Sequence, residues 1–297
     1  MEGGCWMLFL RELTPTEEAV LAPPPPRPRR HFTIGESIAL FTLVGLIVVA
    51  VIGPMIAWYS PIVPSGAPFL PPGSSGHLLG TDNLGFDIGT RVVFGLRISL
   101  FAAVTVTVIS AVAGMILGTV AAFIGGWLDS ALMRVTDLFL AFPATIVAMA
   151  IAASLGSSLT SAMIGIAVVW WPMYARLTRG EVRRVINSPY VEAARMGGTR
   201  GVRLLVKHVL PSVVPTVLVT ASLDVGAVVL TLASLSFIGL GTPAPAPELG
   251  LMASAGMQYI LSAWWIAVIP GIAIALVALV FNYVGDGLRT VLRAKGF

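Results

Sequence analysis

The sequence IALFTLVGLIVVAVIGPMIAW, residues Ile38–Trp58, contains no charged side chain. About 20 apolar residues in a helix cross the hydrocarbon core of a bilayer, so this stretch predicts a membrane-spanning helix. None of the apolar stretches in the chain alternates apolar with polar residues, as the strands of a membrane β-barrel do. We therefore expect an all-α membrane protein with six transmembrane helices. The other five are expected at about Ile98–Ile124, Leu132–Leu155, Leu159–Tyr174, Val213–Leu240 and Trp264–Val284.

The composition supports the same class of protein. Of the 297 residues, 57% are hydrophobic and only 11% are charged, whereas an ordinary soluble domain carries about 25% charged residues. These values exclude a soluble globular enzyme, a disordered chain and a nucleic-acid-binding domain. The single cysteine, Cys5, excludes a disulfide framework and a cysteine-based metal cluster.

The positions of Lys and Arg predict the orientation, because these residues concentrate in cytoplasmic loops. With the N-terminus inside, all but two of the 18 basic residues are cytoplasmic, and only Arg91 and Arg97 lie outside. Both termini are then cytoplasmic. The cytoplasmic loops account for the net positive charge of the chain, so this charge is no indication of a nucleic-acid partner. The expected division is a Pro- and Arg-rich cytoplasmic tail, the first helix with an extracytoplasmic loop, a five-helix core and a cytoplasmic C-terminus, at residues 1–36, 37–94, 95–290 and 291–297.

The tail contains a short polyproline stretch, Pro23–Pro26, which is followed by Arg27, Arg29 and Arg30. We expect these arginines to lie against the anionic headgroups of membrane lipids and to help fix the orientation. Docking of a proline-recognition domain is the alternative interpretation.

Motifs of common enzymes do not occur in the chain. It has no GxxxxGK[ST] phosphate loop, and so does not bind ATP by that route, and it has no HExxH metal motif. The histidines His31, His77 and His208 lie far apart in different predicted loops. We therefore expect no catalytic residue, no cofactor and no metal site in this chain, and do not expect it to be an enzyme.

Asp224 is the acid that stands out in the predicted helices. It lies near the middle of the fifth helix, and no basic residue is within reach along that helix. An ionised group at membrane depth is costly unless it faces water, a partner helix or a path for a substrate. We expect Asp224 to face such a path or a partner helix, and a protonated, packed aspartate is the alternative. By contrast, Asp137 and Asp286 are explained by the nearby Arg134 and Arg289.

The predicted cytoplasmic loop 179–211 contains the pattern of a short helix. Ser188-Pro189 is typical of a helix start, because serine caps and proline suits the first position. The helix covers Tyr190–Met196, and Gly197-Gly198 ends it, since glycine adopts the positive φ of a tight stop. Thr199 is expected to cap the next helix. The small side chains of Ala193 and Ala194 permit close approach by another protein.

Six residues of this loop match the pattern of the EAA loop of ABC importer permeases in register: Glu192, Ala193, Ala194, Gly198, Leu210 and Pro211. His208 stands at a position that is usually aliphatic in that family. The resemblance implies that the loop is a coupling element that docks into a groove of a cytoplasmic ATPase. It also implies that ATP and Mg are bound by separate ATPase subunits or domains rather than by this chain.

Four further segments narrow the resemblance: GTDNLGFD (Gly80–Asp87), GLRISL (Gly95–Leu100), LSFIGLG (Leu235–Gly241) and FNYVGDGLR (Phe281–Arg289). Together they are similar to the C-type permease of dipeptide, oligopeptide and nickel ABC importers. The resemblance implies the type I importer permease fold in a bacterial inner membrane. It also implies a heterodimer with a second permease, two ATPases, and an external binding protein that delivers the peptide.

Residues that depart from the pattern bear on the cargo. Many relatives carry an acid at the position of Leu232, a tryptophan at that of Leu249, and a basic residue at that of Phe86. A nickel chelate or another peptide-like cargo therefore stays open beside peptides.

Two long outer segments are the expected docking surfaces for the binding protein, Tyr59–Arg97 and Thr242–Ala263, with Asp82 and Asp87 as candidate docking residues. A proton-coupled secondary carrier that uses Asp224 as its relay is a rival interpretation. The six predicted spans carry no internal inverted repeat, which argues against that rival.

Overall fold

The computed structural model describes residues 34–294, and these form helices joined by loops. Within this part of the chain, β-structure is limited to two isolated bridges, Ser74 with His77 and Thr81 with Asp87. The expected tail, residues 1–36, lies almost wholly outside the described residues, and so do residues 295–297.

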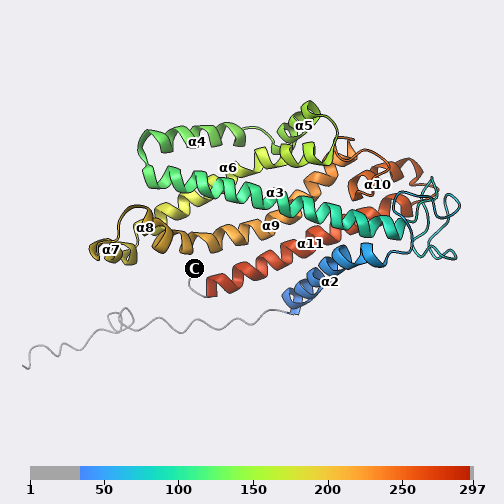
Figure 1. Cartoon of the computed structure of the whole chain (residues 1–297), viewed down its shortest axis with the longest axis horizontal. Coiled ribbons are helices and arrows are strands. Elements are labelled where there is room, and N and C mark those ends of the chain that lie inside the picture. Colours follow the sequence, from blue (N-terminus) through green and yellow to red (C-terminus); the bar gives the residue numbers. More distant parts are fainter. Residues whose placement is uncertain (1–33, 295–297) are drawn as a thin grey trace, which may run out of the picture. The chain divides into compact units, whose positions relative to one another are not determined.

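Five long helices run side by side in this part of the chain (Figure 1). Helix α3 packs against α6 and α9, and α11 packs against α9 and α2. At 1.5 Å per residue, the 37 residues of α3 extend for about 55 Å, well beyond the 30 Å of a hydrocarbon core. The five helices are α2 (Ile34–Ile56), α3 (Ile88–Ile124), α6 (Leu159–Ile186), α9 (Leu210–Phe237) and α11 (Trp265–Ala294).

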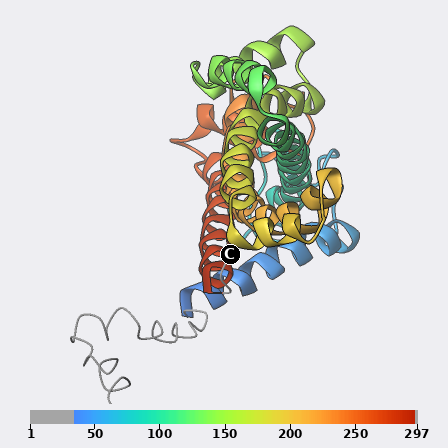
Figure 2. The same ribbon diagram turned by 90° about the vertical axis from the view of Figure 1, so that its left-hand side faces the viewer.

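Two shorter helices replace the straight third span that the sequence predicts. Helix α4 (Gly126–Leu140) and helix α5 (Ala144–Leu155) meet at an angle of 87°. The break contains Pro143, which has no N–H to donate and which disfavours helical backbone in the residue before it. The apolar run Leu132–Leu155 is therefore not one helix. Seen end-on, α4 and α5 lie on the opposite flank of the central helices from α2 (Figure 2).

The predicted count of six spans is not confirmed by helix length and composition alone. Among the described residues, four helices are long and apolar enough to cross a membrane, or five if α4 and α5 together form one span. Helix α6, which contains the predicted fourth span, is not among them. It combines an apolar first half with a second half that carries five charged side chains, Arg176, Arg179, Glu181, Arg183 and Arg184.

Helix α3 begins ten residues before the predicted start at Ile98. Asp87 caps it, because a carboxylate oxygen of Asp87 accepts a hydrogen bond of 2.7 Å from the backbone N–H of Thr90. Arg91 and Arg97, which the sequence suggests lie in the outer loop, are therefore residues of the first three turns of α3.

Close contact between α3 and α6 depends on two glycines. A Cβ atom at Gly118 would lie 2.3 Å from the carbonyl oxygen of Ala175. One at Gly114 would lie 2.4 Å from the Cβ of Tyr174. Helices in a bilayer gain little from excluding water from each other, so close van der Waals packing at small residues is a main source of their association.

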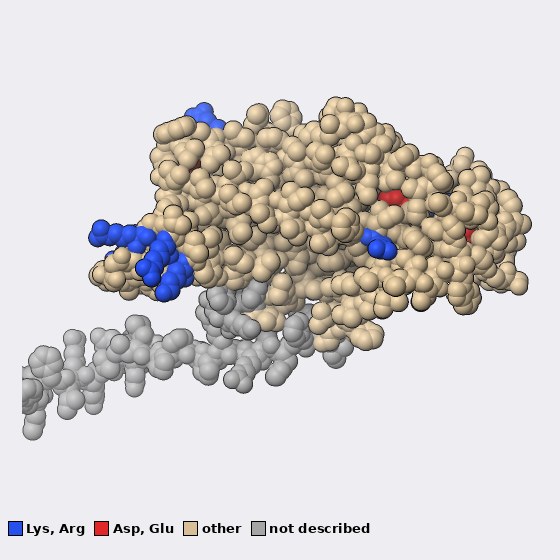
Figure 3. Space-filling view, viewed as in Figure 1, with Lys and Arg blue, Asp and Glu red and all other residues tan. Residues whose placement is uncertain are grey.

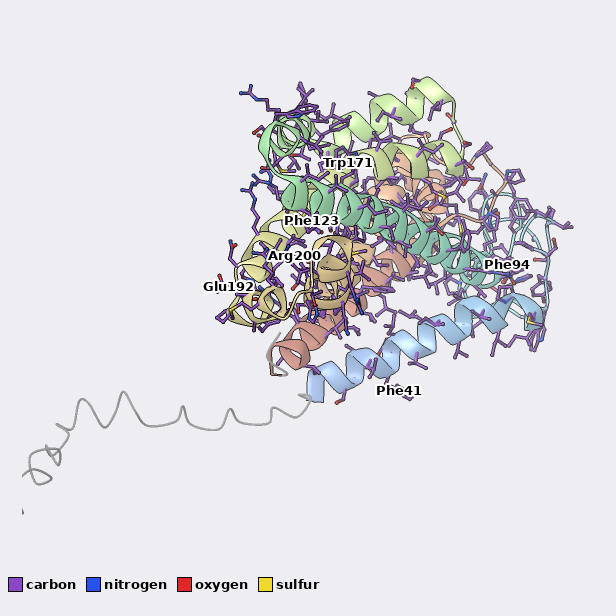
Figure 4. The ribbon with its side chains drawn as sticks, turned by 60° about the vertical axis from the view of Figure 1, so that its left-hand side comes forward. Phe41, Phe94, Phe123, Trp171, Glu192 and Arg200 are labelled. Carbon is purple, nitrogen blue, oxygen red and sulfur yellow. The ribbon has the colours of Figure 1, made fainter. Side chains whose placement is uncertain are left out.

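The large apolar side chains on the outer faces of the helices are exposed, as expected of surfaces that meet lipid or partner helices. Phe41 on α2 is 81% exposed and points away from the other helices (Figure 4). The main cluster of buried apolar residues lies instead between α3, α6, α9 and α11, and it also includes residues of α2, α5 and α10.

We predict that Gly118→Ala lowers the stability of the protein by about 1–3 kcal/mol, because the added methyl group overlaps the backbone of α6. The measurement is thermal unfolding of the purified protein in detergent. Gly180→Ala is the matched control, because a Cβ atom at Gly180 in α6 meets nothing within 4 Å. The control should be as stable as the wild type or slightly more stable, since alanine favours helices. Equal unfolding temperatures for both variants would contradict the close contact.

Candidate functional site

The polar loops of the described chain gather at the two ends of the long helices. Helices α7 (Pro189–Met196) and α8 (Gly201–Leu204) lie at one end, and the loop 57–87 with α10 (Leu249–Gly256) lies at the other (Figure 1). The residues that the sequence assigns to ATPase coupling are therefore at the opposite end from those assigned to docking of a binding protein.

The short helix α7 forms where the sequence predicts it and begins one residue earlier, at Pro189. Ser188 occupies the N-cap position with extended backbone, but its hydroxyl donates to the carbonyl oxygen of Val185 instead of capping α7. The predicted position of the cap is thus confirmed, whereas its side-chain hydrogen bond is not formed.

The end of α7 depends on Gly198, which has a φ of +86°. The N–H of Gly197 donates to the carbonyl of Ala193, and that of Thr199 donates to the carbonyl of Ala194, each at 3.0 Å. These bonds satisfy the last carbonyl groups of the helix. Gly197 itself has an ordinary φ of −73°. The predicted cap at Thr199 is wrong, because the N-cap of α8 is Arg200.

The two alanines of α7 differ in their surroundings. Ala193 and Glu192 are exposed, whereas Ala194 is partly buried. Ala194 packs against an apolar cluster that includes Val191 and Val209, both fully buried. Of the two alanines predicted to face a partner, Ala193 is therefore the more open to a direct contact.

Positive charge surrounds this end of the molecule. Arg195, Arg200, Arg203 and Lys207 are exposed, and within residues 34–294 none of them forms an ion pair. Figure 3 shows Lys and Arg side chains gathered at this end. Glu192 of α7 and Arg200 at the N-cap of α8 both belong to the α7–α8 segment (Figure 4). The surface therefore combines the small side chain of Ala193 with the positive charges of the four basic residues around it.

Helix α6 is fastened to α4 just before this segment. The guanidinium of Arg179 donates to the carboxylate of Asp129 at 2.7 Å, and Arg183 pairs with the same carboxylate. Asp137 on α4 pairs with Arg176. The sequence pairs Asp137 with Arg134, so the structure corrects the partner of this aspartate.

A continuous helical run from Gly201 to Phe237 leads from α8 into α9. It contains one π-helical segment, η1 (Leu205–Val209). Leu210 and Pro211, which match the end of the sequence motif, are the first two residues of α9. Proline is tolerated in this first turn because a backbone N–H at this position would have no acceptor within the helix.

Asp224 lies midway along α9 and is partly exposed. Its Oδ2 atom is buried and has no hydrogen-bond partner of good geometry within the described residues. The fully buried Tyr174 of α6 faces it, and the hydroxyl of Tyr174 also lacks such a partner. The hydroxyl of Tyr174 and the carboxylate of Asp224 therefore lie beside each other, and neither has another partner among the described residues. Whether Asp224 faces a path or a partner permease stays a prediction.

At the opposite end, Asp82 and Asp87 are buried and have partners within the chain. Asp82 accepts from the N–H groups of Leu84 and Phe86 and forms an ion pair of 2.9 Å with Arg91. Asp87 caps α3 and lies 2.9 Å from the Nδ1 atom of His77. Both carboxylates hold the outer loop in place, so their role in docking stays a prediction, and the groups open to a partner are their neighbours.

The two predicted docking segments are joined to each other. Arg91 donates to the carbonyl of Pro245 at 3.1 Å, and the indole N–H of Trp265 donates to the carbonyl of Thr81 at 3.1 Å. A pocket of about 150 Å³ lies between the segments, and Asn83 and Gln258 are among its lining residues. The outer end of the protein therefore presents one joined surface.

Glu248 is an outer residue whose role the sequence analysis misses. It is fully buried and caps α10 by accepting from the N–H groups of Gly250 at 3.0 Å and Leu251 at 2.8 Å. Burial raises the pKa of this carboxyl group, and the two backbone donors partly offset that effect. An acidic residue directly before a helix is a local signal that could have identified the cap.

No group of three His, Cys, Asp or Glu side chains that could hold a metal ion occurs in the described part of the chain.

Comparison with known proteins places these features in a family. Residues 112–295 match the model of the family described as "Binding-protein-dependent transport system inner membrane component". The dipeptide transport system permease protein DppC of Alkalihalophilus pseudofirmus is 39% identical over 261 residues, which are 87% of this chain and 85% of that protein. The "Probable D,D-dipeptide transport system permease protein DdpC" of Escherichia coli is 39% identical over 254 residues, 85% of each chain.

The fold is similar to that of a solved transporter chain. A chain in an inward-facing structure of the MetNI methionine ABC transporter superposes with a TM-score of 0.55. The match covers 69% of this chain and 96% of that chain, at 19% sequence identity. At this identity the likeness concerns the fold, and it agrees with the all-helical permease architecture expected from the sequence. The family match and the relatives together show that this chain belongs to the binding-protein-dependent transport system inner membrane components.

Proposed function

We propose that this chain is a permease subunit of an ATP-driven importer and forms, with a second permease, the translocation path for dipeptides or oligopeptides. The observation that carries the proposal is the helix α7, which exposes Glu192 and Ala193 at one end of the long helices and matches the coupling pattern of such permeases. The family match and the peptide permeases among the relatives support it.

The proposed topology has six spans, with both termini in the cytoplasm of a bacterial cell. Under this proposal α4 and α5 together form the bent third span, and the apolar first half of α6 forms the fourth. The end with α7 and α8 is cytoplasmic, because exposed Arg and Lys gather there. The loop 57–87 and α10 then face the external binding protein.

In the proposed mechanism the ATPases do work on this chain through direct contacts, because the nucleotide sites belong to those other chains. ATP and Mg bind to two partner ATPase subunits or domains, and their closure moves α7. Ala193 lets the backbone of α7 approach the ATPase groove closely, and Glu192 is available to pair with a basic group there. Val191 anchors α7 to the start of α9 through the shared apolar cluster. Movement of α7 therefore shifts the helix that carries Asp224.

Cargo other than peptides is the second candidate function. Leu232, which replaces an acid found in many relatives, is 1% exposed among the apolar residues between α9 and its neighbours. Because this position departs from the pattern of the peptide permeases, a nickel chelate or another peptide-like cargo is the alternative to peptides. The proton-coupled carrier remains the rival mechanism, with Asp224 as its relay.

We predict that the complete complex in vesicles takes up peptide only with ATP, the second permease, the ATPases and the binding protein all present. The measurement is uptake of labelled dipeptide by proteoliposomes with each component omitted in turn. Because the proposed energy source is ATP, a protonophore should leave uptake unchanged. Uptake by this chain alone, driven by a proton gradient, would support the secondary carrier instead.

We predict that Gly198→Val abolishes uptake and makes ATP hydrolysis unresponsive to loaded binding protein. Valine at a φ of +86° costs on the order of 1–2 kcal/mol, so the end of α7 should rearrange. A steric clash is not the cause of this cost, because nothing lies within 4 Å of a Cβ atom at this position. The measurement is ATP hydrolysis by the complex with and without loaded binding protein.

Gly197→Ala is the matched control for Gly198→Val, because Gly197 has an ordinary φ and should tolerate a methyl group. Ala193→Trp tests the contact with the ATPase separately. It adds volume on the exposed side, whereas Ala194→Trp would also disturb the apolar cluster beneath α7. If ATP hydrolysis is fully stimulated by loaded binding protein and uptake is normal in both Gly198→Val and Ala193→Trp, then α7 is not the coupling element.

We predict that Asp224→Leu lowers uptake by about tenfold or more, a change of roughly 1.4 kcal/mol in the barrier. The thermal stability of the protein should change little, because the substitution replaces a carboxylate that is costly at membrane depth with an apolar side chain. Asp286→Asn, at an exposed acid of α11, is the control and should transport normally. Wild-type uptake and assembly in Asp224→Leu would exclude a role in the path or at the partner permease.

A further inference from the structure

Tyr190 connects the short helix α7 to a distant part of the chain. Its hydroxyl donates to the carbonyl oxygen of His208 at 3.1 Å and lies 3.0 Å from the hydroxyl oxygen of Ser212. A tyrosine hydroxyl can donate one hydrogen bond, and here the carbonyl of His208 accepts it. The hydroxyl of Ser212 therefore donates to the oxygen of Tyr190. The second residue of α7 is therefore hydrogen-bonded to groups 18 and 22 residues away.

The two partners of Tyr190 lie on either side of a change in helical winding. His208 belongs to the π-helical segment η1, and Ser212 belongs to the first turn of α9. The N–H of Leu210 donates to the carbonyl of Leu205, five residues earlier. Single π turns inside α-helices are rare and often mark functional sites. Tyr190 thus bridges the one place in the described run Gly201–Phe237 where the helical register changes.

Apolar packing alone does not fix how α7 and α9 move together. Val191 shares an apolar cluster with Val209 and Val213, and such contacts are non-directional. The hydrogen bonds of Tyr190 are directional, because they weaken steeply when donor and acceptor are misaligned. They therefore fix the rotation of α7 relative to the start of α9, which the cluster does not.

We propose that Tyr190 is the positioning residue that transmits the movement of α7 to α9, through its hydrogen bonds to His208 and Ser212. The inference rests on the proposed function, in which an ATPase moves α7, and it names the connection by which that movement reaches the membrane-embedded part of α9. Tyr190 acts through other residues and does not itself touch the cargo.

The test is Tyr190→Phe in the complete reconstituted complex, because phenylalanine keeps the ring and removes only the hydroxyl. Uptake and ATP hydrolysis are measured in the same vesicles to give peptides transported per ATP. We expect this ratio to fall at least about fivefold, because the loss of one typical hydrogen bond gives that factor in an equilibrium and the substitution removes two. Basal ATP hydrolysis and the amount of assembled complex should stay unchanged. A merely structural role would lower the amount of complex and leave the ratio intact.

Further variants locate the effect. Ser212→Ala removes one of the two hydrogen bonds and should lower the ratio by less than Tyr190→Phe. The double variant should resemble Tyr190→Phe alone, since both changes break the same bond. Tyr283→Phe is the matched control, because Tyr283 is exposed and its hydroxyl has no hydrogen-bond partner within residues 34–294. Amide hydrogen exchange should quicken over residues 205–212 in Tyr190→Phe and not in Tyr283→Phe.

The outcomes separate the two proposals. Normal uptake by the wild-type complex together with an unchanged ratio in Tyr190→Phe would overturn the inference alone. Loss of assembled complex at a constant ratio would also overturn it. A wild-type complex that hydrolyses ATP without taking up peptide would overturn the proposed function and this inference with it.

Discussion

Backbone groups within a bilayer core have no water to bond, so every N–H and C=O there needs a partner inside the protein. This constraint explains why the described chain consists of long helices. The cost of a charge at membrane depth explains why its charged clusters lie near the ends of those helices. The ion pair of Asp82 with Arg91 joins the outer loop to the first turn of α3, and that of Asp129 with Arg179 joins the first turn of α4 to the charged half of α6. Between them, the helices associate through small residues such as Gly114 and Gly118. Asp224, midway along α9, is a polar group that departs from this arrangement.

Features that depend on a few neighbouring residues could be predicted from the sequence. The long apolar stretches predict helices because a run of apolar side chains suits the hydrocarbon core wherever it packs. The short helix α7 and its end at Gly198 were predicted because a positive φ is a local demand that glycine meets. The family assignment came from the same region, since the spacing of Glu192, Gly198 and Pro211 is specific.

Features that depend on tertiary contacts could not be predicted. The sequence predicts Arg91 in the outer loop because the apolar stretch starts only at Ile98, but an ion pair with Asp82 lets Arg91 occupy the first turn of α3. The difference between Ala193 and Ala194 depends on what packs beneath α7. The hydroxyl of Ser188 had a competing acceptor in the preceding turn. Pro143 is a local signal for a break in the run Leu132–Leu155, because proline disfavours helical backbone in the residue before it.

The bend between α4 and α5 has a mechanical consequence for the helix beside them. Helix α6 contains Pro172, which removes one backbone hydrogen bond and would allow the helix to kink there. Asp129 of α4 fastens the charged half of α6, while α5 turns back through 87° and packs against α6 as well. The pair acts as a brace that stiffens α6 against flexing at Pro172. Under the proposed coupling, a push delivered at α7, which directly follows α6, would then not be absorbed by bending of α6 and would act on α9.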